Sequence, residues 1–105
     1  MRLDKLTVKS QEAVAEGQRI AEAGGNQELQ PEHLLLALLA DDEGIAVQIL
    51  NRLGADAPGA IKADVEKIVD RFPKASGATP LGQFYASARL KDVFERAMKE
   101  AAHLT

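Results

Sequence analysis

The sequence predicts an all-α fold, a small bundle of about five helices. Three observations lead to this prediction. Apolar residues recur at a spacing of three or four in one segment after another along the 105 residues. No segment alternates polar and apolar residues over the length of a strand, so we expect no sheet. Glycine, proline and small polar residues separate the periodic segments, as they do between helices.

The central element is expected to be the run QPEHLLLALLA at residues 30–40. Pro31 suits the first position of a helix, where no backbone N–H is needed, and Glu32 complements the positive end of the helix dipole. A helix that is apolar nearly all round must be covered on most sides, so we expect Leu35 and Leu38 to be buried. The run is shorter than the roughly 20 apolar residues of a membrane span. It is therefore interpreted as a core helix.

One helix is expected before this run and another directly after it. Thr7 is a good N-cap for the first helix, and Gly24 and Gly25 end it. The next helix, at about residues 45–53, stops at Gly54 and carries the apolar residues Ile45, Ile49, Leu50 and Leu53.

Two more helices complete the predicted bundle. Asp56 caps a helix that ends before Pro73 and carries Ile61, Val65, Ile68 and Val69. Residues 74–83 have the composition of a flexible linker. Ser87 caps the last helix, whose apolar face comprises Leu90, Val93, Phe94, Ala97, Ala101 and Leu104.

The first and last helices are similar to each other in sequence. A shift of 80 positions places Thr7 on Ser87, and it also aligns apolar or small residues throughout both helices. We therefore predict one four-helix repeat at residues 1–73, a linker at 74–86, and the first helix of a truncated second repeat at 87–105.

Composition excludes several classes of function. The formal net charge is −3 and no basic stripe is present, so nucleic acid is not an expected partner. The chain has no cysteine, and its first residues lack the apolar core of a secretory signal. We therefore expect a cytoplasmic protein that does not associate with membranes.

The sequence contains no pattern typical of a catalytic or metal site. Gly77 and Gly82 have the spacing of a phosphate-binding loop, but Gln83 and Phe84 stand where that loop needs Lys and Ser or Thr. The two histidines, His33 and His103, are too few for a typical metal site. We interpret His33 as a first-turn residue that is hydrogen-bonded or solvated. We therefore expect no enzyme, no metal and no cofactor in this stretch of chain.

Several segments taken together resemble a known family. They are the opening RLDKLT, the run PEHLLLALL, the segment ILNRLG, and YASARLKDVFERAMKEAAHL near the end. Their combination resembles the N-terminal repeat domain of the Clp family of AAA+ unfoldases, most closely that of the ClpB-type disaggregating chaperones. The resemblance covers essentially the whole chain.

The resemblance implies a helical module made of two pseudo-repeated four-helix units. It also implies a parent protein that forms a homohexameric ATPase ring, with ATP and magnesium bound outside this module. Such a module captures unfolded or aggregated polypeptides through an apolar groove, or docks adaptor proteins, and transfers substrates to the ring. This chain stops before the second Leu-rich segment of the family, so a site shared by both repeats would be incomplete.

The resemblance also implies roles for two residues. Thr7 falls on a threonine associated with substrate handling, although a plain helix cap explains it equally well. Glu32 falls on a glutamate that helps protease-linked relatives to read phosphorylated arginine, although a first-turn residue that complements the helix dipole needs no ligand.

The apolar face of the last helix gives the main hypothesis for substrate binding. It contains Val93, Phe94 and Ala97, with Met98 beside them. If this face lacks cover, it is a binding or self-association surface. The alternative, which we favour for Phe94 and Ala97, is that it folds onto the first repeat and is buried. Met98 lies off the centre of the face, and its flexible, polarizable side chain suits contacts with varied peptides.

These considerations favour a substrate-binding N-domain of a ClpB-like chaperone. The nearest alternative is an N-domain of a protease-linked unfoldase that docks adaptors or reads phosphoarginine. A helical DNA-binding module and a stand-alone enzyme fit the sequence less well, because the charge balance is acidic and no catalytic constellation is present.

Overall fold

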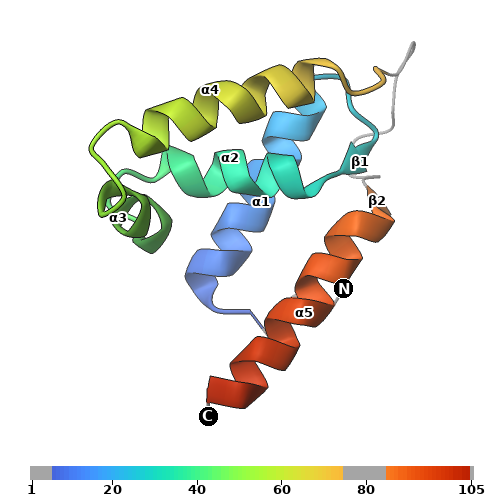
Figure 1. The fold of residues 1–105 in the computed structure, drawn as a ribbon. Helices are drawn as coiled ribbons and strands as arrows, with labels where there is room; N and C mark the ends of the chain where they lie inside the picture. The colour runs from blue at the N-terminus through green and yellow to red at the C-terminus, as the bar shows by residue number, and fades with distance from the viewer. Residues whose placement is uncertain (1–5, 75–84, 105) are drawn as a thin grey trace.

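A computed structural model describes residues 6–74 and 85–104 of the chain (Figure 1). The described residues form five helices and two very short strands, so the all-α prediction is confirmed. In chain order these elements are α1 (Val8–Ala23), β1 (Glu28–Leu29), α2 (Pro31–Ala40), α3 (Ile45–Asn51), α4 (Ala57–Asp70), β2 (Tyr85–Ala86) and α5 (Ala88–Leu104).

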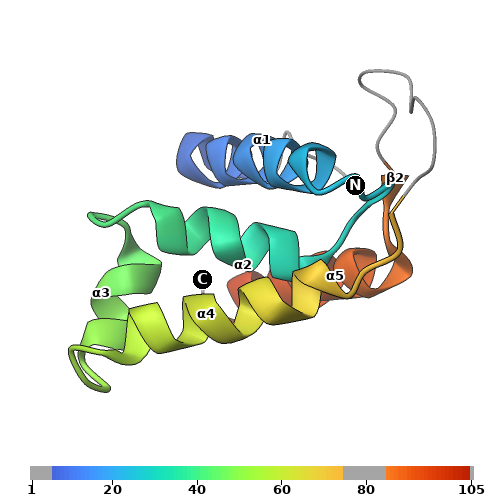
Figure 2. The same cartoon turned by 90° about the horizontal axis from the view of Figure 1, so that it is seen from above.

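Helix α2 is the central element, as the sequence predicts. It lies between α1 on one side and α4 on the other, and α3 closes the end of the α2–α4 pair (Figure 2). Helix α5 begins beside β1 and runs away from this body, so that its last turns extend beyond the other helices (Figure 1).

The buried apolar residues form two main clusters on different sides of α2. One cluster joins α1, β1 and α5 and consists of Val14, Ala21, Leu29 and Leu90; Leu6, Leu34, Ala86 and Phe94 pack against it. The other joins α2 to α4 and consists of Leu36, Val65 and Val69, with Ile20, Leu35, Ile61 and Phe72 against it. The first cluster is the one that receives α5.

The prediction of which leucines of α2 are buried is partly wrong. Leu36 and Leu39 are 7% and 5% exposed, whereas Leu38 is 37% exposed and Leu35 is half-buried. The reason is that α1 and α4 cover two sides of α2 and leave a strip of it open. An apolar sequence cannot indicate which strip stays uncovered.

Helix α3 buries a different residue from those named for it. Val47 is 7% exposed, whereas Ile45, Ile49 and Leu53 are 75%, 58% and 77% exposed. The helix has only 7 residues and touches the rest of the fold where α2 and α4 meet. One side chain is enough to cover that junction, so Ile45 and Ile49 face outward.

The prediction that the chain contains no sheet is wrong in one detail. Strands β1 and β2 form a parallel pair that aligns Glu28 with Tyr85 and Leu29 with Ala86. Two residues are too few to show alternation, so no sequence pattern could reveal this pair. The pair places the start of α5 beside the start of α2.

The predicted helix caps are confirmed at two positions. The Thr7 hydroxyl oxygen accepts a hydrogen bond from the Ser10 N–H at 3.1 Å, and the Ser87 hydroxyl oxygen accepts one from the Leu90 N–H at 3.1 Å. Asp56 occupies the N-cap position of α4, but its side chain makes no capping hydrogen bond.

The predicted division into repeat, linker and second repeat stays a prediction. Of the linker assigned to residues 74–86, the stretch 75–84 with its Gly77 and Gly82 lies outside the described residues. Its last two residues form β2.

Candidate functional site

The apolar face of α5 is exposed over most of its length. Leu90 is fully buried and Phe94 is half-buried, but Val93 and Met98 are 42% and 38% exposed. Ala97 is exposed too, so the expectation that it is buried is wrong. The reason is the direction of the helix, since α5 leaves the body of the domain after its first turns (Figure 1).

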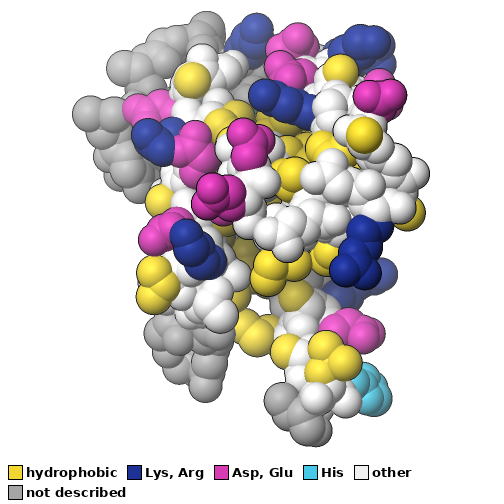
Figure 3. Space-filling view, turned by 90° about the vertical axis from the view of Figure 1, so that its left-hand side faces the viewer, with side chains coloured by type: hydrophobic (Ala, Val, Ile, Leu, Met, Phe, Trp, Pro, Cys, Tyr) yellow, Lys and Arg dark blue, Asp and Glu magenta, His cyan; other side chains and the backbone are white. Residues whose placement is uncertain are grey.

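Charged residues accompany the exposed apolar ones on α5. Asp92 and Arg96 form an ion pair at 3.1 Å on the surface of the helix. Figure 3 views the molecule from the side on which α3 lies in Figure 1, and there too hydrophobic side chains lie among charged ones. A surface of this composition can bind apolar side chains while its charges keep it hydrated.

The structure brings the neighbourhood of Thr7 and the start of α5 onto the same cluster. Leu6, which precedes Thr7, and Phe94 both pack against the buried cluster of α1, β1 and α5. Thr7 is itself exposed, and its hydroxyl also donates a hydrogen bond to the Ser10 hydroxyl at 3.0 Å. The cap therefore accounts for the local structure at Thr7.

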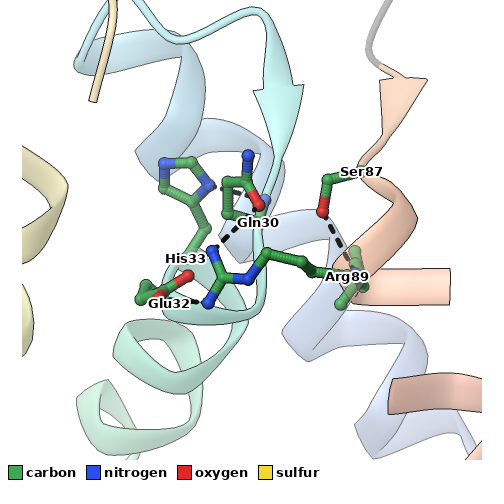
Figure 4. Close-up of polar contacts among 6 residues, drawn as sticks. Gln30, Glu32, His33, Ser87 and Arg89 are labelled. Carbon is green, nitrogen blue, oxygen red and sulfur yellow. Dashed lines mark hydrogen bonds and ion pairs between the residues drawn. The ribbon is translucent and has the colours of Figure 1, made fainter. Parts of the chain in front are cut away.

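Glu32 is engaged by an arginine of α5. Arg89 Nη2 donates to Glu32 Oε2 at 2.7 Å, and Arg89 Nη1 donates to Gln30 Oε1 at 3.5 Å (Figure 4). The Glu32 side chain is 15% exposed and that of Arg89 is 60% exposed. The other carboxylate oxygen, Glu32 Oε1, is buried and has no hydrogen-bond partner within the described part of the chain.

The ion pair keeps Glu32 charged. Burial by itself raises the pKa of Glu32, but the hydrogen bond from Arg89, a backbone hydrogen bond, and the charges of Arg89 and His33 together lower it below its ordinary value. The same contact raises the pKa of Arg89, through the hydrogen bond to Glu32 and its charge. The site is thus a carboxylate that already binds a guanidinium.

Sequence reasoning missed Arg89, although one signal was present. A basic residue in the first turn of a helix opposes the helix dipole and is stabilised by a nearby carboxylate. Arg89 is such a residue in α5, and Glu32 lies in the first turn of α2. The short β1–β2 pair brings these two first turns together.

His33 is fully buried and bonded at both ring nitrogens. Its Nδ1 accepts a hydrogen bond from the Gln30 N–H at 2.9 Å, which assigns the ring proton to Nε2. Nε2 then donates to Asn26 Oδ1 at 3.0 Å, and Asn26 Nδ2 donates to the Pro73 carbonyl at 3.2 Å. The interpretation of His33 as a hydrogen-bonded first-turn residue is confirmed.

The turn after α1 places Asn26 for this contact. Gly25 has a φ of 72°, which glycine adopts without strain, and the Asn26 N–H closes the turn by donating to the Ala21 carbonyl at 2.9 Å. The ring of Phe72 contacts His33 edge-on, with ring centroids 5.6 Å apart. Burial lowers the pKa of His33, although the charge of Glu32 acts in the opposite direction.

No metal site is formed by the residues that the structure describes, because they contain no cluster of three or more His, Cys, Asp or Glu side chains suited to hold an ion. None of the described helices combines the length and the apolar character needed to cross a membrane.

Comparison with known proteins identifies the family. Residues 5–105 match the family model described as the Clp repeat (R) N-terminal domain. The chain is 35% identical over 105 residues to the chaperone protein ClpB of Bacillus cereus, an alignment that covers 99% of this chain and 12% of that protein. It is 39% identical over 106 residues to the ClpB of Nitratidesulfovibrio vulgaris, again with 99% and 12% coverage.

A third relative matches more closely over a shorter stretch. The ClpB of Corynebacterium diphtheriae is 43% identical over 72 residues, which cover 69% of this chain and 8% of that protein. The chain thus spans about an eighth or less of the length of these relatives. Because the family model covers almost all of the sequence, the chain belongs to the family of Clp repeat N-terminal domains.

Proposed function

We propose that this chain is the substrate-binding N-terminal domain of a ClpB-like, ATP-dependent protein disaggregase. It captures unfolded or aggregated polypeptides through the apolar face of α5, with Val93, Phe94, Ala97 and Met98 in contact with the substrate. The observation that carries this proposal is the exposure of that face, since a contiguous exposed apolar strip is typical of a surface that binds a partner.

In this proposal the domain itself is not an enzyme. It belongs to a parent protein whose ATPase ring is a homohexamer and lies in the cytoplasm, and the cofactors ATP and magnesium bind in the ring. Attachment to the ring gives a weakly captured segment a high effective concentration at the pore. Weak and sequence-tolerant capture is therefore sufficient.

Binding of an unfolded polypeptide to variants of α5 tests the proposal. Labelled domain is titrated with a permanently unfolded polypeptide, and amide shifts are followed by NMR. Shifts should gather at residues 90–101 and around Thr7. Val93→Glu and Met98→Glu should weaken binding about tenfold or more, because each places a charge in an apolar contact.

Leu53→Glu is the matched control, because Leu53 is also an exposed apolar residue but lies beside α3. It should bind like the wild type. Equal binding by all three variants, each with an intact fold, would place substrate capture elsewhere on the domain.

A second candidate function is supported by the ion pair at Glu32. The carboxylate already binds a guanidinium, and its second oxygen has no hydrogen-bond partner among the described residues. A phosphoarginine of a substrate, or an adaptor with an arginine, could take the place of Arg89. The site would therefore suit adaptor docking or phosphoarginine recognition. Both are functions expected of a protease-linked unfoldase.

Calorimetry with free phosphoarginine tests this alternative. Arg89→Ala should bind it more tightly than the wild type, because the competing guanidinium is gone, and Glu32→Gln should not bind it. Absence of binding to both the wild type and Arg89→Ala would reject phosphoarginine recognition at this site.

A further inference from the structure

We propose that His33 is a proton-operated latch that holds α5 on the domain. In its neutral form the ring fixes residues 26–30, called here the anchor segment, to which α5 is attached. Protonation of the ring frees the anchor segment and releases α5. This inference concerns the fold itself and does not depend on the proposed function.

Several contacts near its N-terminus attach α5 to the described part of the domain. The Ser87 N–H donates to the Leu29 carbonyl at 3.0 Å, and Arg89 contacts both Gln30 and Glu32. Leu90 is the buried residue of the helix, and each residue from 95 to 104 is exposed. The attachment therefore depends on the position of Leu29 and Gln30, both of which belong to the anchor segment.

His33 holds the anchor segment at both of its ends. At one end Nδ1 accepts from the Gln30 N–H, and at the other Nε2 donates to Asn26 Oδ1. Asn26 extends the connection to the end of α4 through the Pro73 carbonyl. One imidazole ring thus connects the loop after α1, the start of α2 and the end of α4.

A second proton on the ring is incompatible with this arrangement. A protonated Nδ1 is a donor and would face the N–H of Gln30, also a donor. His33 is 0% exposed and Asn26 is 5% exposed, so water cannot provide the missing acceptor without movement of the segment. The anchor segment must separate from the ring.

The surroundings of His33 provide little that would stabilise its positive charge. From α1, Gly17 lies against the backbone carbonyl of His33; from the end of α4, the ring of Phe72 lies edge-on. Glu32, on α2, is the charged group that acts on the ring, and its carboxylate is already paired with Arg89 of α5. Burial outweighs the effect of Glu32 and lowers the pKa of His33.

Linkage gives the direction and the size of the effect. After release, a solvated His33 has an ordinary pKa of about 6.5, whereas in the docked state its pKa is lower. Below about pH 6.5 the released state therefore binds the proton more readily. The equilibrium constant for release rises about tenfold per pH unit until the docked pKa is reached.

Hydrogen exchange measured by NMR tests the latch. The Ser87 amide, which bonds to Leu29, reports release of α5, and the amide of Ala21 in α1 is the internal reference. Between pH 7.5 and 5, protection of Ser87 relative to its intrinsic exchange rate should fall about tenfold per unit below pH 6.5. Ala21 should keep its protection, and the loss at Ser87 should follow the imidazole titration of His33.

Variants test whether the pH dependence of Ser87 protection arises from the His33 ring. His33→Gln cannot be protonated, so protection of Ser87 should no longer depend on pH; His103→Gln, which alters an exposed histidine, should behave like the wild type. If His33→Gln does not fold, Asn26→Asp replaces it. The new carboxylate stabilises the imidazolium in the docked state, raises the pKa of His33 and should reduce the pH dependence.

Two results would overturn the proposal. One is a titration of His33 in the folded protein with no change in the protection of Ser87. The other is a pH dependence that persists unchanged in His33→Gln or, where that variant does not fold, in Asn26→Asp.

Discussion

Arg89 Nη2 lies 2.7 Å from Glu32 Oε2, and this ion pair joins the first turn of α5 to the first turn of α2. The two residues are 57 positions apart in the sequence. They meet because the β1–β2 pair brings the N-termini of the two helices together. The contact therefore depends on the tertiary structure, whereas the two first-turn positions depend only on the local sequence.

Arg89→Ala is expected to raise the pKa of Glu32, because it removes both a hydrogen bond and a positive charge. The lowered pKa stabilises the fold above the ordinary pKa of a glutamate, and this contribution is lost as the pH falls through the folded-state value. NMR titration of the side-chain carboxyl carbon measures the shift. Arg89→Lys, which keeps the charge, should show a smaller change; an unchanged pKa in Arg89→Ala would show that the pair is not formed in solution.

Leu36→Ala and Leu38→Ala should differ strongly in stability. Leu36 belongs to the buried cluster between α2 and α4, so its truncation is expected to cost about 2 to 5 kcal/mol. Leu38 is 37% exposed, so its truncation to alanine should cost about 1 kcal/mol or less. Urea denaturation measures both, and equal losses would show that α2 faces its neighbours differently.

Gly17 and Gly25 should respond in opposite ways to alanine. A Cβ at Gly17 would lie 3.4 Å from Leu29 Cδ1, an ordinary contact, so Gly17→Ala should be neutral or stabilise α1 by about 0.5 to 1 kcal/mol. Gly25 has a φ of 72°, and Gly25→Ala should cost about 1 to 2 kcal/mol through backbone strain. Thermal unfolding measures the stability of both variants. A large loss of stability in Gly17→Ala would mean that α1 and α2 pack more closely than the 3.4 Å distance indicates.

Thr7 variants separate capping from a role in binding. Thr7→Ala should lose about 1 kcal/mol, because the Ser10 N–H loses its acceptor, whereas Thr7→Ser should keep the cap and the stability. Both variants are also assayed for capture of an unfolded polypeptide. Weaker capture by Thr7→Ser at unchanged stability would reveal a role of the threonine methyl group in binding, and equal capture by both variants would leave Thr7 a cap only.

Local signals predicted the helices well. Pro31 marks the start of α2, Gly24 follows the end of α1, and the hydroxyls of Thr7 and Ser87 cap their helices. Each of these signals acts within a few residues along the chain, so the sequence displays it directly. The candidate site was only partly predictable: Glu32 was named, but Arg89 was not.

The sequence by itself determined the helical fold class, the order of the helices and the caps at Thr7 and Ser87, because periodicity and capping are local properties. It also determined the family, through motifs spread over most of the chain. Only the tertiary structure decided that Leu36 is covered and Leu38 is not, and that Ala97 stays exposed. It also decided that His33 bonds to Gln30 and that Arg89 of α5 pairs with Glu32. These outcomes depend on the directions in which α1, α4 and α5 cross α2, and those directions are set by contacts between residues far apart in the sequence.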